Sequence, residues 1–238
     1  MPAAGPFFWS DLLTDEPAAA AAFWASTLDG EVRAAGATPL LVVGGRPVAQ
    51  VLAAGDDAAP HWLLHLAVDD LGAACRRAAF LQGRVLIEPE PVEDLGAGAL
   101  IADPADCVLY PFQHQHAPPG LPPAQPGHLV GGLLFARRVD LGTRFYTALL
   151  GWRSARLGPQ LAGLTADGAP IALCAEAPAA DAPPAQWAPI RRVVDADAAA
   201  ARAVEAGGAV VVPAQAVAGW GRLVVLRDPW GALLSAVS

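Results

Sequence analysis

The chain repeats its own sequence pattern once, and this duplication constrains its fold more than any other feature. Trp62 and Trp187 are 187 − 62 = 125 residues apart. The same offset relates four further landmarks: Asp70 to Asp195, Gly83 to Gly208, Val85 to Val210, and Asp103-Pro104 to Asp228-Pro229. Upstream, Phe23-Trp24 matches Phe145-Tyr146 at an offset of 145 − 23 = 122. Because a fixed offset marks repeated structural units, we expect two homologous halves.

A proline-rich segment separates the halves. Residues 117–127 read Ala-Pro-Pro-Gly-Leu-Pro-Pro-Ala-Gln-Pro-Gly, and such a run favours an extended conformation and cannot enter a sheet interior. We predict a first domain over residues 1–116, a linker over 117–127 and a second domain over 128–238. Two similar domains on one chain can form the interface that a homodimer forms between chains, so we expect a monomer with an internal pseudo-dimer rather than a homodimer.

Within each half, the hydrophobic pattern alternates between strand and helix periods. Pro17 favours the first turn of a helix that ends at Gly30, and Gly44-Gly45 is typical of a hairpin turn. Gly83 fits the left-handed residue that ends a second helix over 71–82. Strands in the first half are expected over residues 7–13, 31–34, 39–43, 47–53 and 62–68, followed by three more that run to residue 112. The second half repeats this order, which predicts an α+β protein with four tandem βαβββ modules forming two domains with curved mixed sheets.

Composition narrows the class of protein. With 54% hydrophobic and 16% charged residues the chain is not disordered, and no run approaches the roughly 18 apolar residues of a membrane span. A net charge of −8 without a basic stripe argues against nucleic acid as a partner. No basic segment precedes the first apolar residues, as a secretory signal would require, so we expect a cytoplasmic protein without a membrane partner. The three cysteines, Cys75, Cys107 and Cys174, are odd in number and lie in apolar runs, so we expect them to be buried and reduced.

Three features together resemble one family. They are the tandem βαβββ modules, the segment Phe-Tyr-x-x-Leu-Leu-Gly-Trp at 145–152, and the Asp-Pro-x-Gly turn at 228–231 before the last strand. They resemble the vicinal oxygen chelate superfamily, which includes glyoxalase I, bleomycin-resistance proteins and extradiol dioxygenases. The first half departs from the pattern, with Leu28-Asp29-Gly30 where Leu-Gly-Trp is usual and Asp106 in place of the turn glycine, although Asp tolerates the left-handed conformation. The resemblance implies sheets curled around a cleft, where many members hold a divalent metal.

The metal-ligand positions that the resemblance implies are not occupied by good ligands here. In metal-binding members the ligands are His, Gln or Glu on the first and fifth strands of a domain and Glu on the eighth. These positions fall on Trp9, Leu63, Tyr110, Gly131, Ala188 and Ser235. A shift of one residue offers Ser10 or Asp11 and Trp62 or Leu64, which leaves fewer than the three nitrogen or oxygen donors of an open metal site. We therefore expect neither a metal nor another cofactor.

The histidines offer rival sites. His61 and His65 have zincin-like spacing, but on a strand they would lie ~13 Å apart. His65 should face the cleft beside Leu63, where it is either a ligand-binding or basic group or a hydrogen-bonded core histidine. His114, His116 and His128 could converge on a metal, but we favour a solvated surface cluster beside the linker.

Aromatic residues form the most informative candidate site. Trp9 shares its strand face with Asp11, and Tyr110 should enter the same cleft, which suits a flat apolar ligand with a polar group. The alternative is that these rings fill the space of an absent metal. In the second half Arg192 is expected to face the cleft and Arg191 to point outward. Arg192 would bind a carboxylate or form a salt bridge to Asp140 or Asp195.

These observations lead to two functional hypotheses. The first is a metal-free small-molecule-binding protein of the glyoxalase/bleomycin-resistance type that binds a hydrophobic or aromatic compound. Its predicted ligand-binding residues are Trp9, Asp11, Leu63, His65, Tyr110 and Arg192. The alternative is a lyase, isomerase or dioxygenase that uses a divalent metal held by residues in another strand register, or metal-free acid–base catalysis by His65 and Asp11. No Gly-rich phosphate loop and no G-x-S-x-G motif is present, so nucleotide chemistry is unsupported.

Overall fold

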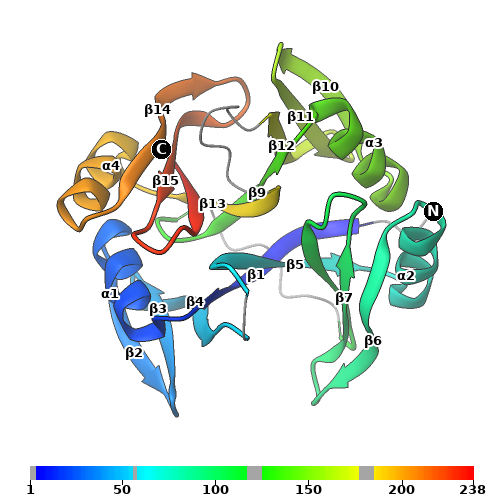
Figure 1. The fold of residues 1–238 in the computed structure, drawn as a ribbon, viewed down its shortest axis with the longest axis horizontal. Coiled ribbons are helices and arrows are strands. Elements are labelled where there is room, and N and C mark those ends of the chain that lie inside the picture. Colours follow the sequence, from blue (N-terminus) through cyan, green and yellow to red (C-terminus); the bar gives the residue numbers. More distant parts are fainter. Residues whose placement is uncertain (1–3, 56–57, 117–124, 177–184) are drawn as a thin grey trace. The chain divides into compact units, whose positions relative to one another are not determined.

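A computed structural model describes residues 4–55, 58–116, 125–176 and 185–238, and these residues form four βαβββ modules, as predicted (Figure 1). The first module contains β1 (Ala4–Thr14), α1 (Pro17–Thr27), β2 (Glu31–Ala35), β3 (Thr38–Val43) and β4 (Arg46–Ala53). The second contains β5 (His61–Val68), α2 (Leu71–Phe80), β6 (Arg84–Val92), β7 (Gly96–Ala102) and β8 (Val108–His114). The third contains β9 (Leu129–Ala136), α3 (Val139–Leu150), β10 (Arg153–Gly158), β11 (Leu161–Ala166) and β12 (Ala169–Glu176). The fourth contains β13 (Gln186–Arg192), α4 (Ala196–Glu205), β14 (Ala209–Val217), β15 (Gly221–Arg227) and β16 (Leu233–Val237).

The strands form two eight-stranded mixed sheets. Their orders are β2-β3-β4-β1-β5-β8-β7-β6 and β10-β11-β12-β9-β13-β16-β15-β14, which become identical when eight is added to each strand number of the first. In each module the first strand runs parallel to the last and the remaining neighbours are antiparallel, as for β5 with β8 and β12 with β9. The duplication in the sequence is therefore a duplication of topology. Residues 117–124 of the expected linker lie outside the described residues, and the domain boundaries stay a prediction.

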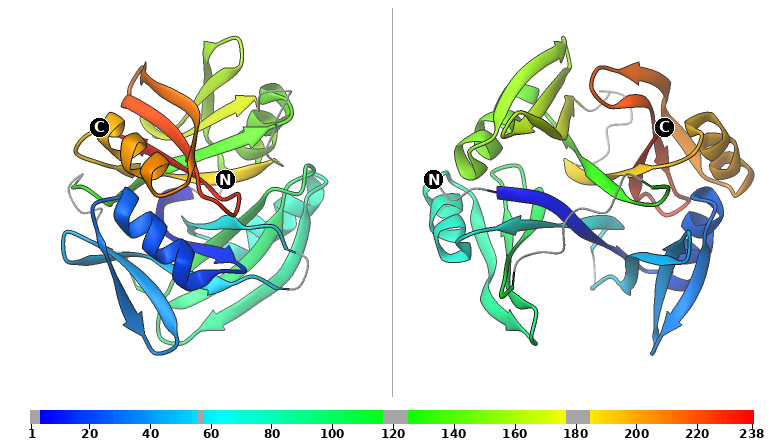
Figure 2. Two further views of the ribbon diagram at one scale, coloured as in Figure 1. Left: turned by 60° about the vertical axis from the view of Figure 1, so that its left-hand side comes forward. Right: turned by 180° about the vertical axis from the view of Figure 1, so that it is seen from behind.

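The backbone contacts divide the chain into two compact units, each built from modules of both halves. The central unit comprises Met1–Phe8, Leu64–Leu121 and Gly131–Trp187, and the terminal unit comprises Trp9–Leu63, Pro122–Val130 and Ala188–Ser238. In the central unit α2 lies beside α3, and in the terminal unit α1 lies beside α4 (Figures 1 and 2). Arg77 on α2 donates to the carbonyl of Ala148 on α3, and Arg202 on α4 donates to the carbonyl of Thr27 at the end of α1. Because 202 − 77 = 125, both arginines occupy one position of the repeat.

A buried aspartate from each Asp-Pro turn joins the modules within a unit. In the central unit Asp103 Oδ2 accepts from the Tyr146 hydroxyl at 3.1 Å, and that hydroxyl accepts from Trp187 Nε1 at 2.9 Å. In the terminal unit Asp228 Oδ2 accepts from Trp24 Nε1 at 3.0 Å. The other carboxylate oxygens, Oδ1, accept from backbone N–H groups of their own turns. Burial raises the pKa of both carboxyl groups, and these hydrogen bonds oppose that rise.

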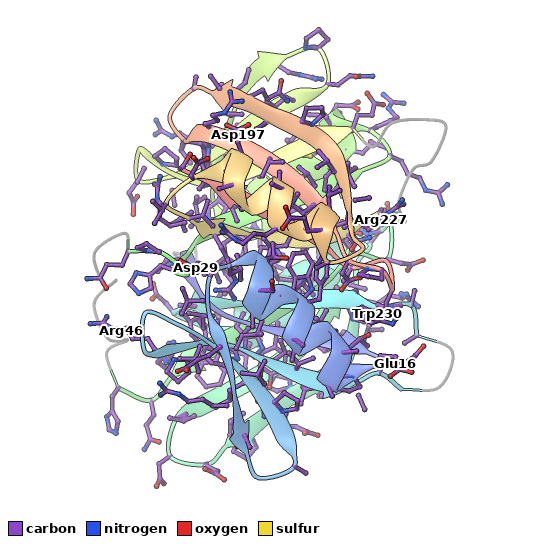
Figure 3. The ribbon with its side chains drawn as sticks, turned by 90° about the vertical axis from the view of Figure 1, so that its left-hand side faces the viewer. Glu16, Asp29, Arg46, Asp197, Arg227 and Trp230 are labelled. Atoms are coloured by element: carbon purple, nitrogen blue, oxygen red, sulfur yellow. The ribbon has the colours of Figure 1, made fainter. Side chains whose placement is uncertain are left out.

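The glycines at the ends of α1 and α2 allow a close approach of another strand, and the residue before each of them adopts the positive φ. The expectation that Gly83 is left-handed is wrong, because Gln82 adopts the positive φ of 66° at the end of α2. Gly83 instead allows a close approach, since a Cβ there would lie 2.7 Å from the carbonyl oxygen of Ala102. At the end of α1, which Glu16 and Asp29 flank in Figure 3, Asp29 takes φ 58° and Gly30 again makes the close approach. A residue that tolerates positive φ therefore precedes a glycine that tolerates crowding.

Two predicted turns are confirmed. Gly44 and Gly45 connect β3 to β4 with φ of 57° and 77°, the signs that a type I′ hairpin requires. Asp106, which stands where the family pattern has glycine, adopts φ 66°. The local sequence therefore determined both backbone conformations.

The core contains mainly tryptophan, leucine, valine and alanine. In the terminal unit Trp24 and Trp62 are buried with their ring centroids 5.9 Å apart, and Trp230 lies against Phe23 at the edge of this core (Figure 3). Cys75, Cys107 and Cys174 are buried and form no disulfide, as predicted. Across the described parts of the chain, each helix is too short or too polar to cross a bilayer.

Candidate aromatic ligand site

Five rings gather on one sheet face of the central unit. They are contributed by Phe8 on β1, His65 on β5, and Tyr110, Phe112 and His114 on β8; we call these residues the aromatic cluster. Strand periodicity places the three residues of β8 on one face, and the parallel pairing of β5 with β8 sets His65 opposite Tyr110 with ring centroids 4.6 Å apart. The ring centroid of Phe8 lies 4.6 Å from that of His114, 5.7 Å from that of Phe112 and 5.9 Å from that of His65. The predicted pair His65 and Tyr110 is thus brought together inside a larger group.

The cluster combines apolar ring surface with polar atoms. Phe112 is buried, while Phe8, His65, Tyr110 and His114 are half-buried. Burial lowers the pKa of His114, which favours the neutral form of its imidazole. Its Nε2 is buried and has no hydrogen-bond partner among the described residues. The arrangement can stack against a flat apolar ligand and offer it imidazole and phenol groups.

A glycine makes room for the Tyr110 ring. A Cβ on Gly98 of β7 would collide with the ring and hydroxyl of Tyr110 on β8. The phenol therefore lies across the neighbouring strand, and any larger residue at position 98 would displace it.

A second pair of predicted residues lies in the terminal unit. Trp9 Nε1 donates to Asp11 Oδ1 at 2.7 Å, which agrees with the prediction that both share a face of β1. Asp11 is 8% exposed, and Trp9 and Leu63 are half-buried. Trp9, Asp11, Leu63 and Arg192 therefore belong to the terminal unit, and His65 and Tyr110 belong to the central unit. That all six residues line one cleft stays a prediction.

The two neighbouring arginines of β13 correct one expectation. Arg191 does not point outward to the surface but is fully buried. It donates to the Ser10 hydroxyl at 2.6 Å and to the carbonyls of Val48 and Gly127 at 2.8 Å, and its guanidinium lies 5.8 Å from the Trp62 ring. Burial lowers the pKa of Arg191 to about 9. Its partners come from segments distant in sequence, which the alternation along one strand cannot reveal.

Arg192 itself is half-buried. It forms no ion pair within the described residues, and its Nε is buried without a partner there. The two predicted partners have other roles, because Asp140 pairs with Arg138 and Asp195 caps α4. Carboxylate binding by Arg192 stays a prediction.

The histidines near the linker separate into different environments. The expectation of a solvated cluster is wrong for His114, because β8 continues to this residue and directs its ring onto Phe8 and Phe112. His116 is exposed, and His128 Nδ1 accepts from the backbone N–H of Gln125 at 3.2 Å. Sequence reasoning missed Phe8, Phe112 and His114 as parts of the site. The alternation of Tyr110, Phe112 and His114 was the signal that could have found two of them.

The donor set does not fit a divalent metal at the positions that the family uses. Leu63, Gly131 and Ala188 offer no side-chain donor, Trp9 offers only an indole N–H, and Ser235 offers one hydroxyl oxygen. Within the described ranges, no three His, Cys, Asp or Glu side chains gather so that they could hold an ion. Tyr110, the remaining position, offers a phenol oxygen. The face that it shares with His65 and His114 therefore carries rings, two imidazoles and a phenol.

Similar proteins agree with this fold. The model of the Glyoxalase/Bleomycin resistance protein/Dioxygenase superfamily matches residues 125–235. "Putative glyoxylase CFP32" from Mycobacterium bovis and from Mycobacterium tuberculosis is 30% identical over 182 residues, which cover 75% of this chain and 69% of each relative. The "Anthracycline biosynthesis protein DnrV" of Streptomyces peucetius is 32% identical over 182 residues, which cover 74% of this chain and 65% of that protein.

Solved structures show the same fold at low identity. The Mn(II)-bound glyoxalase from Novosphingobium aromaticivorans matches with a TM-score of 0.73 at 16% identity, covering 99% of this chain and 82% of that one. The 2,2',3-trihydroxybiphenyl 1,2-dioxygenase from Sphingomonas wittichii matches with a TM-score of 0.71 at 15% identity, covering 97% of this chain and 89% of that one. With these relatives, the repeated βαβββ modules and the Asp-Pro turns, the chain belongs to the glyoxalase/bleomycin resistance protein/dioxygenase superfamily.

Proposed function

We propose that the chain is a metal-free binding protein for a hydrophobic or aromatic small molecule, and that the aromatic cluster is its main contact surface. The observation that carries this proposal is the gathering of Phe8, His65, Tyr110, Phe112 and His114 on one sheet face, most of them half-buried. Binding without chemistry requires apolar area and a few oriented polar groups. The cluster supplies both.

The character of the ligand follows from the rings. Offset or edge-on stacking on Phe8 and Tyr110 favours a flat, polycyclic molecule, and the imidazoles and the phenol favour hydroxyl or carbonyl substituents on it. The relative named for anthracycline biosynthesis supports this choice, because anthracyclines are flat polycyclic compounds with phenol and quinone oxygens.

The proposal includes the predicted residues of the terminal unit. Trp9 offers a further ring, and the Asp11 carboxylate beside it suits a hydroxyl or amino substituent of the ligand. Leu63 and Arg192 are proposed as an apolar contact and a contact to an acidic substituent. These four residues are proposed as ligand contacts within the terminal unit.

Calorimetric titration with an anthracycline, daunorubicin, tests the proposal. Phe8→Leu and Tyr110→Leu should each weaken binding about tenfold, because each removes a stacking ring while keeping an apolar side chain. Phe80→Leu is the matched control, since Phe80 lies in the same unit, is 86% exposed and is not part of the cluster. Unchanged affinity in both cluster variants, or an equal loss in the control, would contradict the proposal.

The alternative is an acid–base lyase or isomerase, and the contact of His65 with Tyr110 is the observation that favours it. An imidazole beside a phenol can move a proton to or from a bound substrate. Metal analysis of untagged protein tests the remaining possibility, which is a metal-dependent enzyme. A stoichiometric metal whose removal abolishes binding or turnover would replace the metal-free proposal with a metal-dependent one.

A further inference from the structure

Besides the aromatic cluster, the central unit contains a polar cavity in its third module, beside helix α3. A cavity of about 260 Å³ lies between α3 and the strands β10 and β11. Helix α3 contributes Asp140, Thr143, Arg144 and Thr147, and β10 contributes Ser154 and Arg156. The spacing of 140, 143 and 147 places these side chains on one stripe of the helix, and residues 154 and 156 share one side of the strand. Thr143 is buried and Asp140 and Thr147 are half-buried, whereas Arg144, Ser154 and Arg156 are exposed. The cavity therefore opens at the edge of the contact between helix and sheet.

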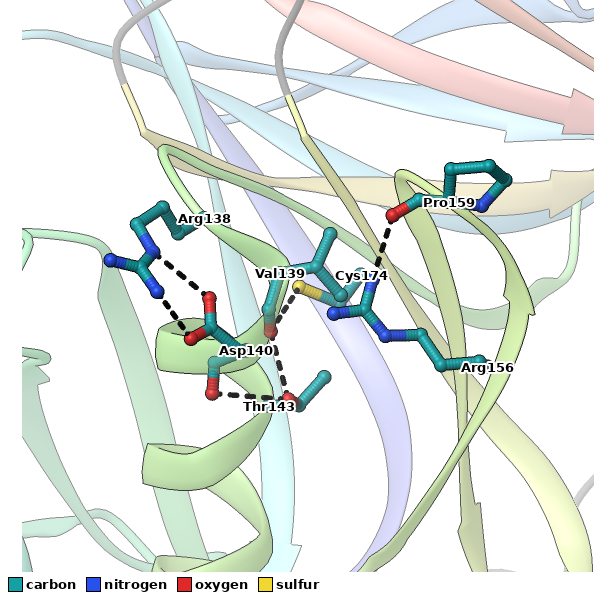
Figure 4. A network of polar contacts seen from close by, with 7 residues as sticks. All are labelled: Arg138, Val139, Asp140, Thr143, Arg156, Pro159 and Cys174. Carbon is teal, nitrogen blue, oxygen red and sulfur yellow. Dashed lines mark hydrogen bonds and ion pairs between the residues drawn. The ribbon is translucent and has the colours of Figure 1, made fainter.

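The charge in this cavity is positive. The Asp140 carboxylate pairs with Arg138 through two hydrogen bonds of 2.7 and 3.1 Å, and this hydrogen bond with Arg138 lowers the pKa of Asp140 (Figure 4). The hydrogen bond to Asp140 raises the pKa of Arg138, and the charge of Glu176 adds to this rise. Neither Arg144 nor Arg156 forms an ion pair with any described residue. Two arginines without a paired carboxylate therefore line the cavity.

The hydrogen-bonding capacity of the lining favours an acceptor as ligand. The hydroxyls of Thr143 and Thr147 already donate to the carbonyls of Val139 and Thr143 at 2.8 and 2.7 Å. Arg156 donates to the carbonyl of Pro159 at 2.8 Å and keeps further N–H groups (Figure 4). The groups that remain to donate into the cavity are the two guanidiniums and the Ser154 hydroxyl. Such a set suits an oxyanion.

The duplicated half of the chain serves as an internal control. At the offset of 145 − 23 = 122, the four positions on α3 correspond to alanines of α1, and the two on β10 correspond to apolar residues of β2. These residues are Ala18, Ala21, Ala22, Ala25, Val32 and Ala34. Since the same module folds with small apolar residues at every one of these positions, packing of the helix on the sheet does not require the charged set. The polar set is therefore particular to the third module.

We propose that this cavity binds a small phosphate oxyanion, either free phosphate or the phosphate group of a metabolite, held by Arg144 and Arg156 with the Ser154 hydroxyl between them. The site is independent of the aromatic cluster, and its success or failure leaves the proposed function unaffected.

NMR titration tests the proposal, with the side-chain Nε–H signals of the arginines as the readout. Sodium phosphate and glycerol 3-phosphate are the probes, ionic strength is held constant with sodium chloride, and glycerol is the uncharged control. We expect saturable shifts of the Arg144 and Arg156 signals with both probes. Tighter binding of glycerol 3-phosphate would identify a phosphorylated metabolite, and equal or tighter binding of phosphate would identify the free ion. Shifts that do not saturate with either probe would overturn the proposal.

Three variants complete the test. Arg144→Gln and Arg156→Gln should each weaken phosphate binding about tenfold, because each removes a charged donor. Arg153→Gln is the matched control, since Arg153 is exposed on the same strand and does not line the cavity. Ser154→Ala provides a smaller loss in a variant that keeps both charges, and the buried Trp187 indole signal reports whether each variant keeps its fold. Wild-type affinity in both glutamine variants, or an equal loss in the control, would refute the site.

Discussion

Removal of a single oxygen atom by Tyr146→Phe tests the hydrogen bonds that join Asp103 of the second module, Tyr146 of the third and Trp187 of the fourth. The Tyr146 hydroxyl donates to Asp103 Oδ2 and accepts from Trp187 Nε1, and all three side chains are at least 96% buried. The variant leaves a buried carboxylate oxygen without one donor and a buried indole N–H without an acceptor. The loss of a hydrogen bond to a charged group costs about 1.5–3 kcal/mol, and an unsatisfied buried donor costs about 1–3 kcal/mol. We expect the free energy of unfolding to fall by ~3 kcal/mol.

The pH dependence of this loss has a defined sign. Burial raises the pKa of Asp103 above its ordinary value of 3.8, while the Tyr146 hydroxyl favours the charged form and opposes the rise. The hydroxyl therefore stabilises the folded protein where Asp103 is ionised, and this contribution is lost as the pH falls through the folded-state pKa, which lies above 3.8. The cost of Tyr146→Phe should be larger near neutral pH than near pH 4. The loss of stability that comes from the unsatisfied Trp187 N–H should be the same at both pH values.

Urea unfolding followed by circular dichroism measures this effect. With a slope of about 2–3 kcal/mol per molar, the midpoint should fall by about 1–1.5 M near neutral pH. Asp103→Asn and the double variant close a thermodynamic cycle that isolates the coupling between the two side chains. A loss below about 1 kcal/mol, or a loss that is the same at both pH values, would refute the reasoning.

Three further predictions follow from the same repeat. Trp62 Nε1 is buried and lacks a hydrogen-bond partner among the described residues, whereas its repeat partner Trp187 donates to the Tyr146 hydroxyl. Trp24 occupies the position of Tyr146 in the repeat, so only Trp24→Tyr, and not Trp24→Phe, supplies a hydroxyl there. The tyrosine variant should be about 2 kcal/mol more stable than the phenylalanine variant in urea unfolding, and equal stability would count against this reasoning. Gly83→Ala should lower the free energy of unfolding by about 2 kcal/mol, since its Cβ would lie 2.7 and 3.0 Å from the backbone oxygens of Ala102 and Ala78. The control Gly158→Ala, whose Cβ would have nothing within 4 Å, should change that free energy by no more than about 0.5 kcal/mol, as measured by thermal unfolding. Light scattering should give a mass near 24.3 kDa, and a persistent mass of twice that would show a further interface between chains.

The sequence was most informative where structure depends on neighbouring residues. Helix starts, the Gly44-Gly45 hairpin and the left-handed Asp106 follow from local backbone preferences, and the repeat offset extended them to four modules. It was less informative at Gln82-Gly83, because positive φ and close approach both favour glycine, and only the distance to Ala102 separates them.

The candidate site was predictable only in part, for a related reason. The period of two along each strand predicted that His65 and Tyr110 face one cleft, and the pairing of β5 with β8 sets them opposite each other. It could not reveal that β1 adds Phe8 to these rings, or that β8 extends to His114. The burial of Arg191 depends on oxygens 64, 143 and 181 residues away, so alternation along β13 alone gave a wrong surface position.

The pairing of Asp-Pro turns with distant aromatic residues has a kinetic consequence. Asp103 and Tyr146 are 43 residues apart, whereas Trp24 and Asp228 are 204 residues apart. Most of the central unit comes from one stretch of chain, but the terminal unit needs both ends of the sequence. During synthesis the first module leaves the ribosome well before the fourth module that completes its unit, and the closure of this long loop precedes the contacts that stabilise it. We therefore expect the terminal unit to complete its contacts later than the central unit, although the two share one topology, and the first module to be open to aggregation in that interval.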